Sequence, residues 1–229
     1  TFWGHTLNGI LYYPDLPEKL NSSTLNGLNI ELWRTNGSSN YMAYEINRGQ
    51  QQLPQNNFVN MPSQPRNFFK LQSKIYFIAT NEGKENLYSL NEDFTFNNGK
   101  SNNQWNEGDN WAGQIVPFES DDALIPAGKT PEINGNASVK NISVSSPLNL
   151  SAGNLNIAGN LNLGAKITLN GNNLNLKGSS SQITNGNSTN YIVTNGTGSV
   201  NVENLNSARG TVNLPIGTAT NYNPVSIAN

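Results

Sequence analysis

The sequence predicts an all-β protein, in which an N-terminal antiparallel β domain is followed by a parallel β-helix with about 19 residues per coil. A short unit repeats at a fixed interval of 19 residues between residues 146 and 183. Within each unit, apolar and polar residues alternate as they do in a strand with one buried face. Helical periodicity is not sustained anywhere, and prolines interrupt the windows of the N-terminal half that are long enough for a helix.

The repeat aligns residues of the same kind. A shift of 19 residues brings Leu148 onto Ile167 and Leu155 onto Leu174. Each unit contains triplets such as Leu-Asn-Leu, separated by corners such as 152–154 and 158–160, whose small residues and Asn tolerate positive φ. Three short strands in each repeat describe a triangular coil, and coils of this length stack into a solenoid.

One such coil cannot be stable alone, because the apolar surface that it buries does not offset the entropy lost on fixing its backbone. Coils must therefore stack, and the ends of the stack need caps or neighbouring domains. Outward asparagines also fall in register, as Asn156 does with Asn175. They could form amide ladders, or they could simply suit the corners and keep the outer surface hydrated.

The composition excludes several classes of protein. Only 12% of the 229 residues are charged and the net charge is −2, so no basic patch predicts nucleic-acid binding. The absence of cysteine excludes disulfides and cysteine-ligated metals and is typical of exported bacterial proteins. No signal peptide or membrane-length apolar run is present, and we expect the chain to be a mature or trimmed piece of something longer.

Four segments are predicted along the chain. Residues 1–98 form an antiparallel sandwich-like β domain, 99–104 a linker, 105–215 the solenoid with a Trp-containing cap, and 216–229 the start of a following β segment. Turn signals lie at 36–37 and 81–83, and residues 49–62 are expected to form a long polar loop. The N-terminal domain is expected to contain short strands at 10–13, 28–33, 41–46, 68–71, 75–79, 87–90 and 94–96.

Trp105 and Trp111 lie at the expected mouth of the solenoid. Their large apolar side chains would cover the open end of the first coil, which is the interpretation that we favour. The alternative is a ligand site in which both rings stack on a sugar and Asp109 or Asp122 accepts hydrogen bonds from its hydroxyls.

The sequence offers little catalytic chemistry. His5 is the only histidine, so no histidine-based triad or zinc site can form without it, and we expect a surface or packing role. Because parallel β-helices host polysaccharide-cleaving enzymes, paired carboxylates need attention. The candidates are Asp121–Asp122, Glu107 with Asp109, and Glu92–Asp93.

These acid pairs do not predict an enzyme. Neighbouring acids in a strand point to opposite faces, and the coil faces carry Asn, Ser and Thr instead of charged groups. We therefore predict no catalytic residues, no metal ligands and no cofactor. A calcium site built from Asn106, Glu107 and Asp109, joined by Asp121 and Asp122, is the remaining alternative, although the spacing matches no standard calcium loop.

The segment that begins at Trp105 resembles the opening of a repeat-rich module found in large secreted and surface proteins of Bacteroidota. In that family a Trp-Asn-Trp opening leads through a Val-Pro segment, an Asp-Asp pair and an Ile-Pro-Ala-Gly turn into parallel β-helix coils. The resemblance covers residues 105–229. It rests on Trp105, Asn110–Trp111, Val116–Pro117, Asp121–Asp122, Ile125–Gly128 and the closing phrase from Leu214 to Val225.

The resemblance implies export by the type IX secretion system and a place on the outer cell surface or outside the cell, often in adhesins and gliding-motility proteins. The C-terminal sorting domain of such cargo is not visible in this sequence. We expect a non-enzymatic segment of a large adhesin-like protein, whose solenoid is a stiff spacer or an adhesive surface.

The expected partners are the secretion or cell-surface machinery and surface glycans, without nucleic acid and without a membrane-spanning segment. The alternative is a carbohydrate-binding or polysaccharide-processing β-helix module. Its ligand would bind either at Trp105 and Trp111 or at the N-terminal aromatic residues Trp33, Tyr41 and Tyr44.

Overall fold

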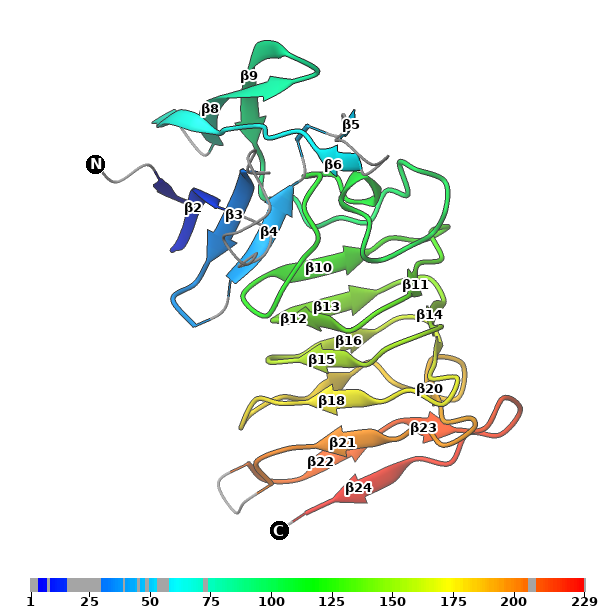
Figure 1. Ribbon diagram of the computed structural model, residues 1–229. Helices are drawn as coiled ribbons and strands as arrows, with labels where there is room; N and C mark the ends of the chain where they lie inside the picture. Colours follow the sequence, from blue (N-terminus) through cyan, green and yellow to red (C-terminus); the bar gives the residue numbers. More distant parts are fainter. Residues whose placement is uncertain are drawn as a thin grey trace. The chain divides into compact units, whose positions relative to one another are not determined.

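The computed structural model describes residues 4–7, 9–15, 30–38, 40–44, 46–47, 50–52, 58–71, 74–205 and 209–228, with the backbone alone at 44, 50–52 and 58–60. The chain forms two compact units, Thr1–Glu92 and Asp93–Asn229. Apart from the single 3₁₀ turn Gly108–Asn110, the described regular structure consists of β-strands (Figure 1). The predicted all-β fold is therefore confirmed.

The first unit contains a four-stranded antiparallel sheet in the order β1-β2-β3-β4. The predicted turn at 36–37 joins β3 to β4, and Gly37 adopts a φ of +92°. The short first strand was not predicted. The strands are β1 (His5–Leu7), β2 (Ile10–Asp15), β3 (Glu31–Thr35) and β4 (Asn40–Tyr44).

A second antiparallel sheet of the first unit has the order β7-β8-β9. Its strands are β7 (Arg66–Leu71), β8 (Lys74–Asn81) and β9 (Lys84–Leu90). Strand β1 contacts both β7 and β8, so the two sheets meet at β1. One face of the second sheet contributes Ile75, Phe77 and Ala79 to the core.

The expected polar loop at 49–62 is wrong in part. Strands β5 (Gln50–Gln52) and β6 (Phe58–Asn60) pair with each other as an antiparallel hairpin. A run of glutamines shows no apolar alternation, so the pattern gave no sign of a strand. Residues 53–57, in the middle of the expected loop, lie outside the described residues.

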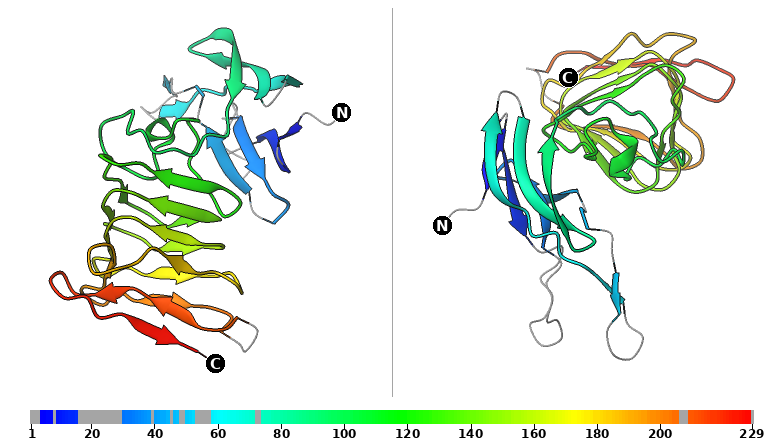
Figure 2. Two further views of the ribbon diagram at one scale, coloured as in Figure 1. Left: turned by 180° about the vertical axis from the view of Figure 1, so that it is seen from behind. Right: turned by 90° about the horizontal axis from the view of Figure 1, so that it is seen from above.

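The second unit is a parallel β-solenoid with three sheets, in which each strand pairs with the strand of the next coil. Seen from above, its coils superimpose as a three-sided outline (Figure 2, right). The first sheet contains β10 (Asp122–Ile125), β13 (Asn141–Val144), β16 (Leu161–Leu163) and β19 (Ile183–Thr184). The second contains β11 (Glu132–Ile133), β14 (Leu148–Leu150), β17 (Ile167–Thr168), β20 (Ile192–Val193) and β23 (Ile216–Gly217). The third contains β12 (Ala137–Val139), β15 (Leu155–Ile157), β18 (Leu174–Leu176) and β21 (Val200–Val202).

The predicted register is confirmed at the residues that define the repeat. Leu148 pairs with Ile167, and Leu155 pairs with Leu174. After Ile183 the coils become wider, as the loosening of the pattern predicts. The spacing between stacked partners increases from 19 residues at Asn156 and Asn175 to 26 at Asn175 and Asn201.

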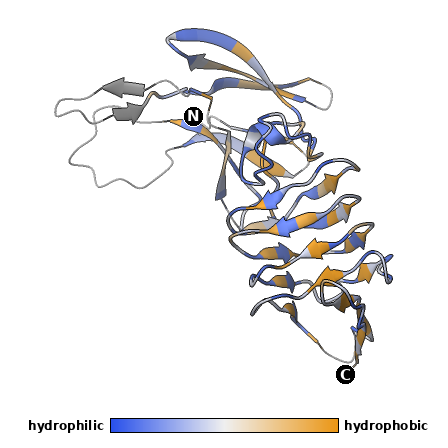
Figure 3. Ribbon diagram, turned by 90° about the vertical axis from the view of Figure 1, so that its right-hand side faces the viewer, coloured by the Kyte–Doolittle hydropathy of each residue, from blue (hydrophilic) through white to orange (hydrophobic). Residues whose placement is uncertain are grey.

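The interior of the solenoid is an aliphatic column. Along each strand the apolar residues are buried and the intervening polar residue faces outward, which Figure 3 shows as alternating orange and blue segments. Leu155, Ile157, Leu174 and Leu176 have no exposed surface. Each coil thus covers the apolar side chains of its neighbour, which is the burial that one coil cannot achieve alone.

Asparagine amides connect the coils on the outer surface, so of the two alternatives for the outward asparagines the structure shows the amide ladder. Asn175 donates from Nδ2 to Oδ1 of Asn156 at 2.8 Å, and Asn201 donates from Nδ2 to Oδ1 of Asn175 at 2.8 Å. At a neighbouring corner, the Asn154 side chain accepts from the backbone N–H of Asn173 at 2.8 Å. The stacked amides therefore bind one another. They also bind backbone groups at the corners, which form no hydrogen bonds with a neighbouring strand.

The two predicted corners use glycine for different reasons. Gly153 has a φ of +123°, and a Cβ there would approach the backbone N of Asn136 to 2.6 Å. Gly159 has no positive φ, but a Cβ would lie 2.9 Å from the carbonyl oxygen of Lys140 in the preceding coil. Gly153 is therefore required both by its positive φ and by the close approach of the neighbouring coil, and Gly159 by the close approach alone.

The boundaries between segments differ from those expected. The predicted strand at 94–96 belongs to the second unit, where Thr95 bridges to Leu124 and Phe96 to Trp111. The predicted linker at 99–104 also lies in this unit and ends in a bridge from Gln104 to Glu132. Within 216–228, β23 extends the second solenoid sheet, and β24 (Val225–Ile227) pairs antiparallel with β22 (Val212–Leu214).

We predict that Asn175→Ala destabilises the protein by roughly 1–2 kcal/mol, because it removes two amide hydrogen bonds from the middle of the ladder. The measurement is the free energy of unfolding in urea. The matched control is Asn223→Ala, since the exposed Asn223 side chain makes no hydrogen bond to any residue that the structure describes, and we expect a change within about 0.5 kcal/mol. Equal effects of the two substitutions would show that the ladder contributes nothing to stability.

Candidate functional site

Residues 93–118 cover the first coil of the solenoid. The backbone N–H of Phe96 donates to the carbonyl oxygen of Leu124 at 2.9 Å, and that of Trp105 donates to the carbonyl oxygen of Glu132 at 2.9 Å. These two bonds place short extended segments on the exposed edges of β10 and β11. The segment therefore continues the solenoid by part of one coil and closes its edges.

Three aromatic rings fill the end of the aliphatic column. Phe96, Trp105 and Trp111 have no exposed surface. The Trp105 and Trp111 rings meet edge to face with centroids 4.7 Å apart, and Phe96 meets Trp111 edge to face at 5.3 Å. The Nε1 of Trp111 donates to the carbonyl oxygen of Trp105 at 2.8 Å. This arrangement is that of a cap, and it leaves no ring face of Trp105 or Trp111 on which a sugar could stack.

Asn110 holds the polar part of the cap together, a role that its place in the Trp-Asn-Trp motif did not predict. Its buried side chain donates from Nδ2 to Oδ1 of Asn102 and to the carbonyl oxygen of Gln104, and its Oδ1 accepts from the backbone N–H of Lys100. Its carbonyl oxygen accepts from the backbone N–H of Asn97. One amide thus orders most of the segment that was expected to be a linker.

The two candidate sugar-binding carboxylates each bind a neighbouring polar side chain. Asp109 lies in the 3₁₀ turn and forms an ion pair with Lys100, with 3.0 Å between Oδ2 and Nζ. Asp122 is exposed on β10 and accepts from Nδ2 of Asn141 at 2.7 Å. Both carboxylates therefore have partners within the solenoid unit.

The remaining acids do not form a shared site among the described residues. Asp121 is buried, and its side chain accepts from the backbone N–H of Phe118. Its neighbour Asp122 is exposed, so the two side chains point to opposite sides, as expected. Glu92 accepts from the Tyr12 hydroxyl in the first unit, and Asp93 accepts from the backbone N–H of Thr95 in the second. No group of three or more acidic, histidine or cysteine side chains suitable for a metal occurs in the described ranges.

The N-terminal candidates form no open aromatic platform in the part of the chain that the structure describes. Trp33 and Tyr41 are half-buried on neighbouring strands, and the side chain of Tyr44 lies outside the described residues. His5 is half-buried on β1, where its Nδ1 lies 3.2 Å from the carbonyl oxygen of Thr6.

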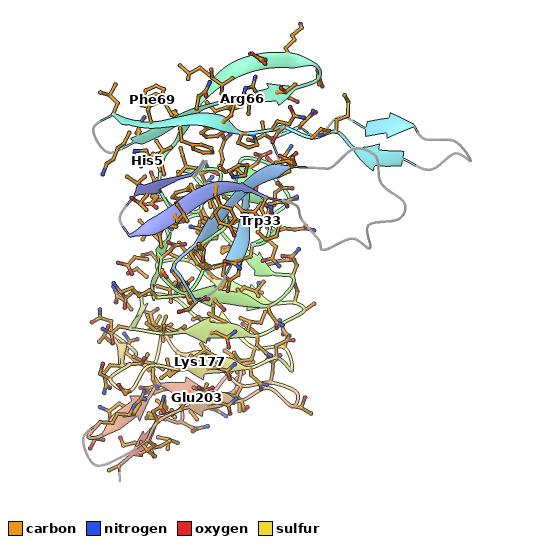
Figure 4. All side chains as sticks on the ribbon, turned by 60° about the vertical axis from the view of Figure 1, so that its left-hand side comes forward. His5, Trp33, Arg66, Phe69, Lys177 and Glu203 are labelled. Atoms are coloured by element: carbon orange, nitrogen blue, oxygen red, sulfur yellow. The ribbon has the colours of Figure 1, made fainter. Side chains whose placement is uncertain are left out.

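The outer surface of the solenoid is mostly amide and hydroxyl groups. Its exposed charges include Lys177 and Glu203, which lie on consecutive coils and form an ion pair at 2.9 Å (Figure 4). At a different corner of the coils, Nζ of Lys166 lies 4.5 Å from the centre of the Tyr191 ring. These contacts join one coil to the next and bring no two carboxylates together.

Comparisons of the chain with protein-family models, with curated proteins and with solved structures give no match. Within the described ranges, no helix has the length and apolar composition that crossing a bilayer requires.

We predict that Trp111→Ala lowers the free energy of unfolding of the solenoid unit by about 3–5 kcal/mol, because it leaves a large cavity beside Trp105 and Phe96. Urea denaturation followed by far-UV circular dichroism measures the loss. Trp33→Ala, at a half-buried position of the first unit, should leave the solenoid transition in place. An unchanged solenoid transition in Trp111→Ala would contradict the capping role.

Proposed function

We propose that the chain is a non-enzymatic segment of a large adhesin-like bacterial surface protein, and that its solenoid is a stiff spacer or an adhesive surface. The observation that carries this proposal is the division of the solenoid into an aliphatic interior and an amide-rich exterior. Both parts are used to hold successive coils together. A repeat-type structural module needs contacts of this kind between every coil and the next. A hydrolase or lyase instead needs charged side chains that point toward one substrate site.

The burial of the cap supports the same function. Trp105 and Trp111, the residues first considered for sugar stacking, are packed in the column, and Asp109 is paired with Lys100. A structural role thus accounts for each conspicuous residue of the cap.

Display outside the cell and export by the type IX secretion system are part of the proposal and are supported by the sequence resemblance of residues 105–229. Disabling that secretion system in the producing bacterium should remove the protein from the cell surface and the culture medium. Unchanged surface labelling by an antibody would contradict this export route.

We predict that the purified chain releases no reducing ends or unsaturated sugars from a panel of plant, algal and bacterial polysaccharides. We also predict that Asp109→Asn and Asp122→Asn leave this null result and the melting temperature almost unchanged, because both side chains keep an uncharged hydrogen-bonding group. Reducing-sugar and absorbance assays make the measurement. Polysaccharide cleavage that either substitution abolishes without lowering the melting temperature would establish an enzyme instead.

A further inference from the structure

Asn–Gly pairs recur along the chain, and most of those that the structure describes lie in loops and corners of the solenoid unit. In such a pair the backbone nitrogen of glycine can attack the side-chain amide of asparagine, because no glycine side chain hinders the approach. Each pair is therefore a chemically possible site of spontaneous modification. The pairs described in full begin at Asn36, Asn98, Asn134, Asn170, Asn185 and Asn195.

The modification is deamidation through a cyclic imide. The glycine nitrogen gives its proton to hydroxide and forms a bond to Cγ of the asparagine, which moves an electron pair onto Oδ1. The C=O bond then forms again, the Cγ–Nδ2 bond breaks, and Nδ2 takes a proton from water and leaves as ammonia. Water opens the imide at either carbonyl, giving aspartate or isoaspartate. A glycine N–H without a hydrogen bond and a donor to Oδ1 both favour the attack, since the donor stabilises the charge on Oδ1.

The loop of the cap holds both reacting groups of the pair at Asn98. The Asn98 side chain donates from Nδ2 to Oδ1 of Asn103 at 2.7 Å and accepts from the backbone N–H of Asn103 at 2.9 Å. The N–H of Gly99 donates to Oδ1 of Asn97 at 3.0 Å. The nitrogen and the amide can therefore meet only after this loop opens.

Stacking of the coils holds the pair at Asn170 in the same way. The N–H of Gly171 donates to the carbonyl oxygen of Asn195 at 3.0 Å, and Oδ1 of Asn170 accepts from Nδ2 of Asn195 at 2.8 Å. The Asn195 amide is held at both ends, because its Oδ1 accepts from the backbone N–H of Asn170 at 2.6 Å. Attack at either asparagine thus requires these two coils to separate locally.

The pairs at Asn36 and Asn185 each lack one of the two favourable features. The N–H of Gly37 donates to Oγ1 of Thr35 at 3.0 Å, so this nitrogen is engaged. Oδ1 of Asn185 accepts no hydrogen bond from any described residue, and its Nδ2 donates to Oδ1 of Asn162 at 2.6 Å.

Asn134 combines both features at an exposed corner that follows β11. The N–H of Gly135 forms no hydrogen bond within the described part of the chain. The backbone N–H of Asn106 donates to Oδ1 of Asn134 at 3.3 Å, and Nδ2 of Asn134 donates to Oε1 of Gln104 at 3.2 Å. Both bonds are long, so they restrain the side chain weakly, and the Asn106 N–H is placed to stabilise charge that develops on Oδ1.

We propose that Asn134 is a site of spontaneous deamidation in the folded protein, and that it reacts faster there than the other described Asn–Gly pairs. The reaction needs only water and hydroxide. The fold protects Asn98 through the cap loop and Asn170 through the stacked coils, so the structure selects one site from chemically equivalent pairs.

Deamidation of Asn134 weakens the closure of the first coil. The carboxylate product has lost the Nδ2–H group that donates to Gln104, and isoaspartate adds a methylene to the main chain between β11 and β12. Gln104 itself bridges to Glu132, the residue that begins β11. Modified chains should therefore have a lower melting temperature than intact ones.

Peptide mapping by mass spectrometry, after incubation in mildly alkaline buffer, tests the proposal on the full chain. In the folded chain, Asn134 should deamidate roughly tenfold faster or more than Asn98 and Asn170, because the hydrogen bonds of these two must open first. In concentrated urea the three sites should react at similar rates, since each is followed by glycine.

Asn134→Gln is the matched control variant. A glutamine side chain must close a larger, six-membered ring and therefore reacts far more slowly. During an incubation that lowers the melting temperature of the wild-type chain, the melting temperature of Asn134→Gln should stay at its own starting value. An equal fall in both would show that deamidation of Asn134 does not weaken the cap.

Three results would overturn the assignment of the site. The first is an Asn134 that stays intact in the folded chain but reacts in urea. The second is deamidation of Asn98 or Asn170 in the folded chain as fast as that of Asn134. The third is a difference in rate that persists in urea, which would trace it to the neighbouring sequence instead of the fold.

Discussion

The solenoid depends on the vertical alignment of aliphatic side chains from one coil to the next. Leu155 lies against Leu174, and Leu174 against Val200, so each apolar residue is covered from above and below. The same alignment pairs the backbones of successive strands and brings the outward asparagines within hydrogen-bonding distance. A shift of one residue would turn each apolar side chain outward, so the register, the core and the amide ladder form together or not at all.

An aligned column must be closed at its ends, which explains the least regular parts of the second unit. At the first coil, Phe96, Trp105 and Trp111 cover the column, and Asn110 ties the surrounding loop together. Near the last coils, the buried Arg209 donates to the carbonyl oxygens of Gly178, Ser181 and Glu203. The conspicuous aromatic and charged residues of this unit are therefore largely used for closure, which is consistent with a structural module.

The parts of the fold that could be predicted are those in which buried apolar residues recur at a fixed interval along the sequence. Leu148 and Ile167 reveal the coil because their spacing is regular and the residues between them alternate. Residues 99–104 were interpreted as a linker because Asn, Gly and Ser suit flexible chains, yet Ser101 and Asn103 adopt positive φ in an ordered loop. Composition shows that such a loop is polar, but it does not show which backbone groups its side chains will bind.

The candidate site illustrates the same limit. The two tryptophans at the start of the repeat indicated either a cap or a platform, and only their burial distinguishes these interpretations. Asn110 was noted only as part of the motif that opens the module, because a sequence motif does not show which groups a buried amide will bind. The exposure of Phe69 and Leu71 on β7 was also missed, since the bulge between Arg66 and Phe69 breaks the alternation that would have shown which side of this strand is exposed.

Disulfide formation between engineered cysteines measures the stacking of coils most directly, because the natural chain contains no cysteine. Asn156→Cys with Asn175→Cys should oxidise readily to an intramolecular disulfide detectable by mass spectrometry, since these residues are paired on adjacent strands about 4.8 Å apart. Asn156→Cys with Asn162→Cys should not, although these positions are closer in sequence, because they lie in different sheets. Rapid oxidation of the second pair with none in the first would contradict the stacked solenoid.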